Sequence, residues 1–178
     1  MSPSQRPKCS VLYIDNSADD HFLFQCAVVK SETPLHIQPF FSGEPAIAYL
    51  KDQAPFAGLS VYPYPSFVLY DHDPGSSKGD NLTSAVRAFH PSAGLPIIIL
   101  SDSADDTSVA NSYQTGVDHF VRKPTTSTRL AIIVQTLYDC AMSNPRDFNA
   151  LTRLPEYEPR PAASRAAKPA SPRPITSP

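Results

Sequence analysis

Short runs of β-branched, aromatic and aliphatic residues alternate along the chain with longer segments in which apolar residues recur every three or four positions. Runs of the first kind predict strands, and segments of the second kind predict helices. The expected strands are residues 9–14, 35–41, 66–71, 96–100 and 117–122, and the expected helices are residues 18–30, 43–53, 79–89, 104–115 and 127–142. Five strand-helix units in strict alternation predict an α/β fold with a doubly wound, five-stranded parallel sheet.

The first predicted helix shows how local signals support these assignments. Ser17 precedes residues 18–30 and is a residue type that caps helix N-termini. Within the helix, Phe22, Cys26 and Val29 fall roughly on one face.

The composition changes sharply near residues 144–145. The chain beyond this point is rich in Pro, Ala and Arg and poor in apolar side chains that could offset the entropy of ordering it. We therefore expect one folded domain over residues 8–143 and a disordered tail over residues 144–178.

Charge and cysteine content exclude several classes of protein. A net charge of -2 and a pI near 6.2 give no basic field, which argues against direct nucleic-acid binding by the folded part. The three cysteines are widely spaced and include no CxxC pair, so neither a disulfide framework nor a zinc cluster is indicated. The first apolar run is broken by Asp15 and is too short for a signal peptide or a membrane span. We expect a cytoplasmic protein.

Three polar residues each end a predicted strand, namely Asp71, Ser101 and Lys123. In an open parallel sheet the carboxyl ends of the strands meet along one edge, so these side chains are expected to converge. A carboxylate, a hydroxyl and an ammonium in one site are suited to handling a phosphoryl group on the carboxylate.

Several motifs follow one another in a familiar order: residues 14–20, Asp71 with Gly79 after it, residues 96–101 and residues 120–124. Together they resemble the receiver domain of a bacterial two-component response regulator over about residues 8–143, which implies a flavodoxin-like (βα)5 fold. Residues 48–50, 101–103 and 112–113 further resemble the single-domain regulators that accompany bacterial phytochromes.

The resemblance implies roles for individual residues. Asp71 would accept a phosphoryl group from a histidine kinase, Lys123 would pair with a phosphoryl oxygen, and Ser101 would donate a hydrogen bond to it. It also implies a Mg²⁺ site whose ligands are the side chains of Asp15, Asn16 and Asp71 and the backbone carbonyl of Asp73.

The chain departs from the family pattern near this site. Asn16 stands where the family usually places a second acidic residue, so we expect weakened Mg²⁺ binding. Pro74 follows Asp71 by three residues, where the family usually has four. Two hypotheses therefore stay open: a working receiver, and a phosphorylation-independent pseudo-receiver that serves as a binding module.

The favoured hypothesis is a single-domain response regulator that is not an enzyme and signals through protein contacts. Its implied partner is a sensor histidine kinase, with a phytochrome-type photoreceptor suggested by the second resemblance. In the family, the region matching residues 104–142 forms the signalling and dimerising face, so a homodimer is expected.

An enzyme of the haloacid-dehalogenase type is a weaker alternative, based on residues 71–73 as an Asp-x-Asp motif. It is disfavoured because Gly75 stands where that motif needs Thr or Val, and because no acidic pair follows Lys123.

Overall fold

The computed structural model describes residues 9–57, 64–71, 77–89, 94–102 and 104–162. Its sheet has the strand order β2-β1-β3-β4-β5-β6. The strands are β1 (Cys9–Ile14), β2 (Leu35–Phe40), β3 (Phe67–Tyr70), β4 (Ile97–Ser101), β5 (His119–Arg122) and β6 (Tyr157–Glu158). Strands β1 to β5 are parallel, which confirms the predicted α/β class, and β6 runs antiparallel to β5.

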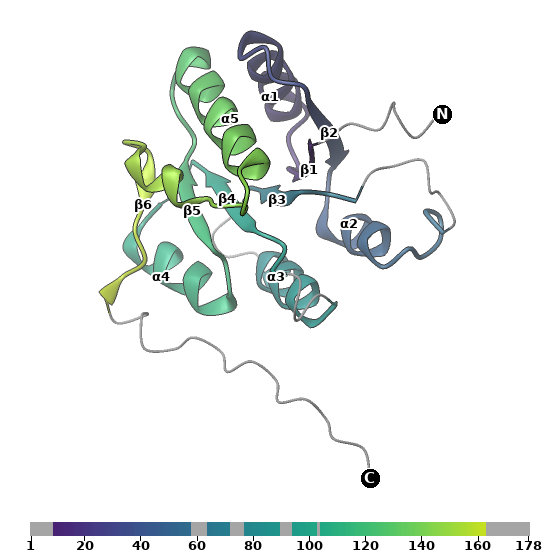
Figure 1. Ribbon diagram of the computed structural model, residues 1–178. Coiled ribbons are helices and arrows are strands. Elements are labelled where there is room, and N and C mark those ends of the chain that lie inside the picture. The colour runs from purple at the N-terminus through teal and green to yellow at the C-terminus, as the bar shows by residue number, and fades with distance from the viewer. Residues whose placement is uncertain (1–8, 58–63, 72–76, 90–93, 103, 163–178) are drawn as a thin grey trace.

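The helices lie on both faces of the sheet. They are α1 (Ala18–Lys30), α2 (Gly43–Leu50), α3 (Ser77–Phe89), α4 (Asp106–Thr115) and α5 (Ser127–Met142), followed by the 3₁₀ helix η2 (Asn149–Arg153). Helices α1 and α5 cover one face, and α2, α3 and α4 cover the other (Figure 1).

Each face of the sheet carries its own apolar cluster, because successive side chains of a strand point to opposite faces. In β1, Val11 and Tyr13 pack in the cluster under α1 and α5, whereas Leu12 and Ile14 pack in the other. A strand buried on both faces reads as a continuous apolar run, which is why β4 could be found from its aliphatic sequence.

Side-chain caps determine where several helices begin. The Ser17 hydroxyl accepts a hydrogen bond from the backbone N–H of Asp20, and the Thr126 hydroxyl accepts one from Arg129. At the end of α4, Gly116 adopts a φ of 105°, a left-handed conformation that suits glycine. Helices α1 and α5 consequently span the predicted residues.

The face of α1 that carries Phe22, Cys26 and Val29 is exposed. Phe22 and Val29 are 67% and 69% exposed, and Cys26 is also exposed. The helix instead buries Phe24, together with the small residue Ala27. The Phe24 ring stacks on Tyr13 at a centroid distance of 4.4 Å, which orients the helix on the sheet.

The prediction of disorder from residue 144 onward is wrong for residues 144–162, which pack on the domain. Leu151 in η2 is fully buried, and the Phe148 ring meets the Phe67 ring at 5.5 Å. A few apolar residues spaced along the segment are enough to anchor it, although prolines and charged residues dominate its composition. Residues 163–178 lie outside the described part of the chain.

Strand β6 covers the edge of the sheet at β5. The N–H of Arg122 donates to the carbonyl of Glu156 at 2.8 Å, and the Tyr113 hydroxyl donates to the carbonyl of Glu158 at 2.6 Å. The Arg129 guanidinium also donates to both carboxylate oxygens of Glu156, each at 2.7 Å.

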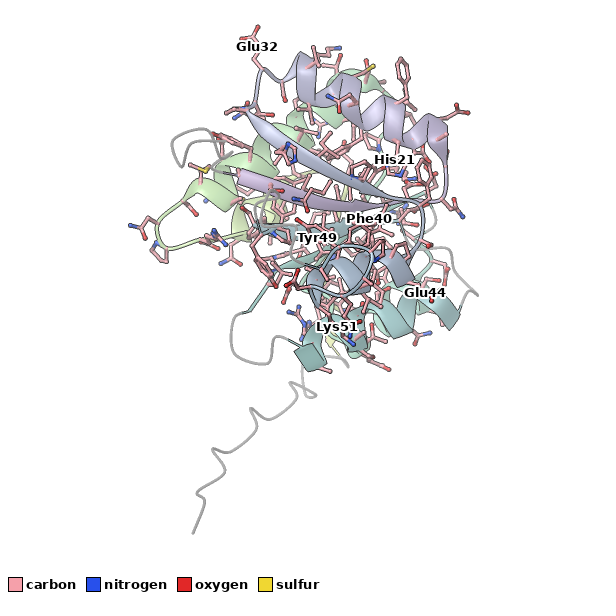
Figure 2. All side chains as sticks on the ribbon, turned by 90° about the vertical axis from the view of Figure 1, so that its right-hand side faces the viewer. His21, Glu32, Phe40, Glu44, Tyr49 and Lys51 are labelled. Carbon is pink, nitrogen blue, oxygen red and sulfur yellow. The ribbon has the colours of Figure 1, made fainter. Side chains whose placement is uncertain are left out.

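The opposite edge of the sheet is formed by β2 (Figure 2). Phe40 of β2 and Tyr49 of α2 lie near each other in this view, with ring centroids 5.6 Å apart, and Phe56 completes the aromatic group. These rings line an apolar hollow of about 520 Å³.

Within the described segments, no helix has the length and apolarity needed to cross a membrane.

Candidate functional site

Three strand ends bring the predicted polar residues to one edge of the sheet. The N–H of Asp71 donates to the carbonyl of Ile14 at 2.9 Å, which continues the pairing of β3 with β1. In the same way, the N–H of Lys123 donates to the carbonyl of Ser101 at 2.9 Å. The backbone ladder thus fixes Asp71 beside β1 and Lys123 beside the end of β4.

The ammonium of Lys123 lies among carboxylates from three elements of the chain. Its Nζ is 3.0 Å from Oδ2 of Asp15, 2.8 Å from Oδ2 of Asp20 and 3.2 Å from Oδ2 of Asp71. The carboxylate oxygens of these three aspartates lie within 4.8 Å of one another. Asp102 is more distant, at 4.0 Å, and its side chain is 81% exposed. We refer to Asp15, Asp20, Asp71 and Lys123 as the acidic pocket.

Asp15 is the most rigidly held member of the acidic pocket. The Tyr13 hydroxyl donates to its Oδ2 at 2.9 Å, and the N–H of Ser17 donates to its Oδ1 at 2.9 Å. Burial and the negative charge of Asp15 raise the pKa of Tyr13, so its hydroxyl stays protonated and able to donate. One carboxylate is therefore fixed in place before any ligand arrives.

The charges of Asp71 and Lys123 are set by their surroundings. Burial raises the pKa of Asp71; Lys123 opposes this shift, and the negative charge of Asp15 adds to it. Burial alone would lower the pKa of Lys123, but hydrogen bonds to Asp20 and Asp15 and the charge of Asp71 raise it overall. Lys123 is thus a permanent cation beside a carboxylate that is less acidic than usual.

The remaining predicted site residues are Ser101, Asn16 and Asp73. Ser101 is buried at the end of β4, where its carbonyl accepts the hydrogen bond from Lys123. Asn16 is exposed. Asp73 lies outside the described residues.

Asp20 is the pocket residue that the sequence argument missed. It lies in the first turn of α1, where an acidic residue is ordinarily explained by its favourable interaction with the helix N-terminus. Asp20 also forms an ion pair with Lys123, and this contact depends on how α1 is placed relative to the end of β5. The available sequence signal was the pair Asp19-Asp20, which begins two residues after Ser17.

The donor set of the acidic pocket fits a hard divalent cation. Such a cation prefers carboxylate oxygens, and Mg²⁺ usually binds through one or two of them while keeping several waters. Three carboxylates with one ammonium leave two net negative charges when all four groups are ionised. The side chains of Asp20 and Asp71 are 28% and 23% exposed, so water reaches the pocket.

The apolar hollow at the β2 edge is separate from this chemistry. It is lined by residues of β2, α2 and the segment after α2, and none of the pocket carboxylates is among them. Charged groups converge in the acidic pocket, which makes it the candidate functional site.

Comparison with solved structures identifies the same fold in response regulators. A response regulator in red-light signalling of R. palustris is 20% identical and superposes with a TM-score of 0.69, covering 76% of this chain and 94% of that chain. The phosphorylated cyanobacterial phytochrome response regulator RcpA is 21% identical with a TM-score of 0.64, over 76% of this chain and 95% of that one. The Mn²⁺-bound form of the response regulator Rcp1 is 21% identical with a TM-score of 0.59, over 72% of this chain and 91% of that one.

No protein-family model and no curated protein matches the sequence. At identities near 20%, the structural likeness shows that this chain has the receiver fold. The fold that the sequence resemblance implied is therefore confirmed.

Proposed function

We propose that this chain is a single-domain response regulator of a two-component phosphorelay, in which Asp71 receives a phosphoryl group from a histidine kinase. The observation that carries the proposal is the Lys123 ammonium, 3.2 Å from Asp71 in a pocket that also holds Asp15 and Asp20. A nucleophilic carboxylate with a fixed cation beside it is the arrangement that aspartyl phosphorylation requires.

The proposed transfer forms one bond at Asp71 and breaks one bond in the kinase. A carboxylate oxygen of Asp71 attacks phosphorus, the bond from phosphorus to the kinase histidine nitrogen breaks, and an acyl phosphate remains on Asp71. Lys123, held as a cation, pairs with a phosphoryl oxygen, and the Ser101 hydroxyl donates a hydrogen bond to another.

A bound Mg²⁺ would offset the negative charge that gathers during phosphoryl transfer. The ligand set carried over from the family is Asp15, Asn16, Asp71 and the carbonyl of Asp73. Support for a metal comes from the clustered carboxylates and from the Mn²⁺-bound form of the similarly folded Rcp1. An amide at Asn16 supplies no charge, so the site is expected to bind Mg²⁺ weakly if Asn16 is the second ligand.

The proposed partner is a sensor histidine kinase of the phytochrome type, in the cytoplasm. The type of kinase is suggested by similarly folded regulators that are described as acting in red-light signalling or with phytochromes. Output is proposed to be a protein contact, without enzymatic turnover and without direct nucleic-acid binding.

A homodimer through α4, β5 and α5 is part of the proposal. Because β6 pairs with the edge of β5 and its segment also contacts Tyr113 of α4 and Arg129 of α5, a dimer would use the exposed remainder of these two helices. On α5, Ile132 and Met142 are each 41% exposed and offer apolar contact area.

The test is incubation with Mg²⁺ and acetyl phosphate, followed by intact-mass measurement. We expect one phosphoryl adduct on the natural chain and on Asp102→Asn, and none on Asp71→Asn. Absence of an adduct on the natural chain at saturating Mg²⁺ contradicts the proposal and favours the phosphorylation-independent binding module.

A further inference from the structure

Asp20 makes the shortest of the contacts between Lys123 and its four carboxylate neighbours. Its Oδ2 is 2.8 Å from Nζ, compared with 3.0 Å for Asp15 and 3.2 Å for Asp71. This contact crosses from the first turn of α1 to the residue that follows β5. Asp20 is therefore directed into the pocket, away from the solvent-facing side of its own helix.

Two neighbouring polar residues of the same loop and turn are exposed. They are Asn16 and Asp19, and Asp19 is not among the clustered carboxylates. The β1–α1 region thus supplies two carboxylates to the pocket, Asp15 and Asp20.

Charge balance indicates what these carboxylates are suited to hold. Lys123 neutralises one of three negative charges, and it does so from a position among all three carboxylates. A hard divalent cation would neutralise the remaining two, and it would bind the same oxygens that the ammonium now contacts. An ammonium and a cation that share ligands compete, so the cation affinity depends on every carboxylate that Lys123 touches.

We propose that Asp20 supplies a ligand charge to the divalent-cation site, beside Asp15 and Asp71. The proposal rests on the proposed function for the identity of the cation as Mg²⁺. It removes the expectation that Asn16 weakens the site, because the charge missing at Asn16 is provided from the first turn of α1.

The experiment is calorimetric titration of the full chain with MgCl₂ alone, without a phosphodonor. Asp20→Asn is compared with Asp19→Asn, which makes the same charge change at an exposed position of the same turn, and with Asn16→Ala. We expect Asp20→Asn to weaken Mg²⁺ binding about tenfold or more, the loss of one ligand charge. Asp19→Asn and Asn16→Ala are expected to stay within about twofold of the natural chain.

Two measurements keep the result interpretable. Thermal unfolding in EDTA establishes that each variant is folded, and Asp20→Glu, which keeps the charge, is expected to recover most of the affinity. The proposal is overturned if Asp20→Asn binds Mg²⁺ like the natural chain, if Asn16→Ala is as weak as Asp20→Asn, or if the natural chain binds no Mg²⁺.

Failure of this proposal is distinguishable from failure of the proposed function. Phosphoryl labelling of Asp71 with an unchanged Mg²⁺ affinity in Asp20→Asn overturns the role of Asp20 alone. An affinity that depends on Asp20, without any labelling of Asp71, supports the role of Asp20 and contradicts phosphorylation.

Discussion

The Nζ atom of Lys123 lies 3.2 Å from Oδ2 of Asp71, yet the pKa of Asp71 is raised. Burial is the main cause, and the negative charge of Asp15 adds to it, so the nearby cation only partly compensates. The ionised carboxylate of Asp71 is thus held in the folded chain at a cost to stability.

This relationship predicts that Asp71→Asn stabilises the protein at pH 7. Because the folded-state pKa of Asp71 is raised, its contribution to stability is fully present below its usual value of 3.8 and is lost as pH rises through the folded pKa. A neutral amide avoids that loss. Thermal unfolding at several pH values should show a higher midpoint for Asp71→Asn at pH 7 and a shrinking difference toward pH 3.8.

The control for this prediction is Asp102→Asn, which removes a carboxylate near Lys123 whose side chain is 81% exposed. Its midpoint should follow that of the natural chain. A lower midpoint for Asp71→Asn at pH 7 would show that the ion pair with Lys123 outweighs burial.

Lys123→Met should be strongly destabilising, because it leaves three clustered carboxylates without their cation. The Asp15 side chain is fully buried, whereas those of Asp20 and Asp71 are 28% and 23% exposed, so water screens the repulsion only in part. Breaking a buried ion pair by removing one partner costs roughly 3 kcal/mol. Urea unfolding should show a loss of this size, and millimolar Mg²⁺ should restore part of it.

Lys30→Met provides the comparison for Lys123→Met. Lys30 is exposed and its Nζ contacts only hydroxyl oxygens among the described residues, those of Ser127 and Thr128. Its removal should change the free energy of unfolding by no more than about 0.5 kcal/mol. If Lys123→Met costs less than about 1 kcal/mol, the pocket carboxylates are not held together by this lysine.

Much of the fold could be predicted because local signals and tertiary packing agree. The aliphatic run of β4 is buried on both faces, and α1 begins at the Ser17 cap as its sequence indicates. Strand β6 could not be found in this way, since two residues, Tyr157–Glu158, have no periodicity. It forms because the edge of β5 is open to it and η2 anchors the chain beside it.

The site was predicted in part for the same reason. Asp71 and Lys123 follow β3 and β5 directly, Ser101 is the last residue of β4, and parallel topology alone brings strand ends together. Asp20 belongs to a helix, and the direction of its side chain depends on where α1 packs, which the pattern of residues does not specify.

Glu156→Gln should loosen the C-terminal segment in a pH-dependent way. Hydrogen bonds from Arg129 lower the pKa of Glu156, so its contribution is present above the usual value of 4.5 and is lost as pH falls through the folded pKa. At pH 7 we expect a loss of roughly 0.5 kcal/mol, which allows for solvent screening at the partly exposed Arg129.

Hydrogen exchange at the N–H of Arg122, which donates to the carbonyl of Glu156, is the local measurement for this substitution. At neutral pH this N–H should exchange faster in Glu156→Gln than in the natural chain, and at a pH well below 4.5 the two proteins should exchange at the same rate. Glu44→Gln, an exposed substitution on α2, should leave the exchange rate of this N–H unchanged. Equal exchange at pH 7 would mean that β6 is held without the ion pair.

Leu151→Ala tests whether the segment after α5 belongs to the cooperative fold. Leu151 is fully buried among residues of the α1–α5 side of the core, so its truncation should leave a cavity and cost about 2–4 kcal/mol in urea unfolding. Leu154→Ala, at a half-buried neighbour of the same segment, should cost less. A loss of unfolding free energy below about 0.5 kcal/mol for Leu151→Ala would show that the segment is outside the cooperative folding unit. Truncation of a buried leucine within such a unit destabilises the protein by about 2 kcal/mol or more.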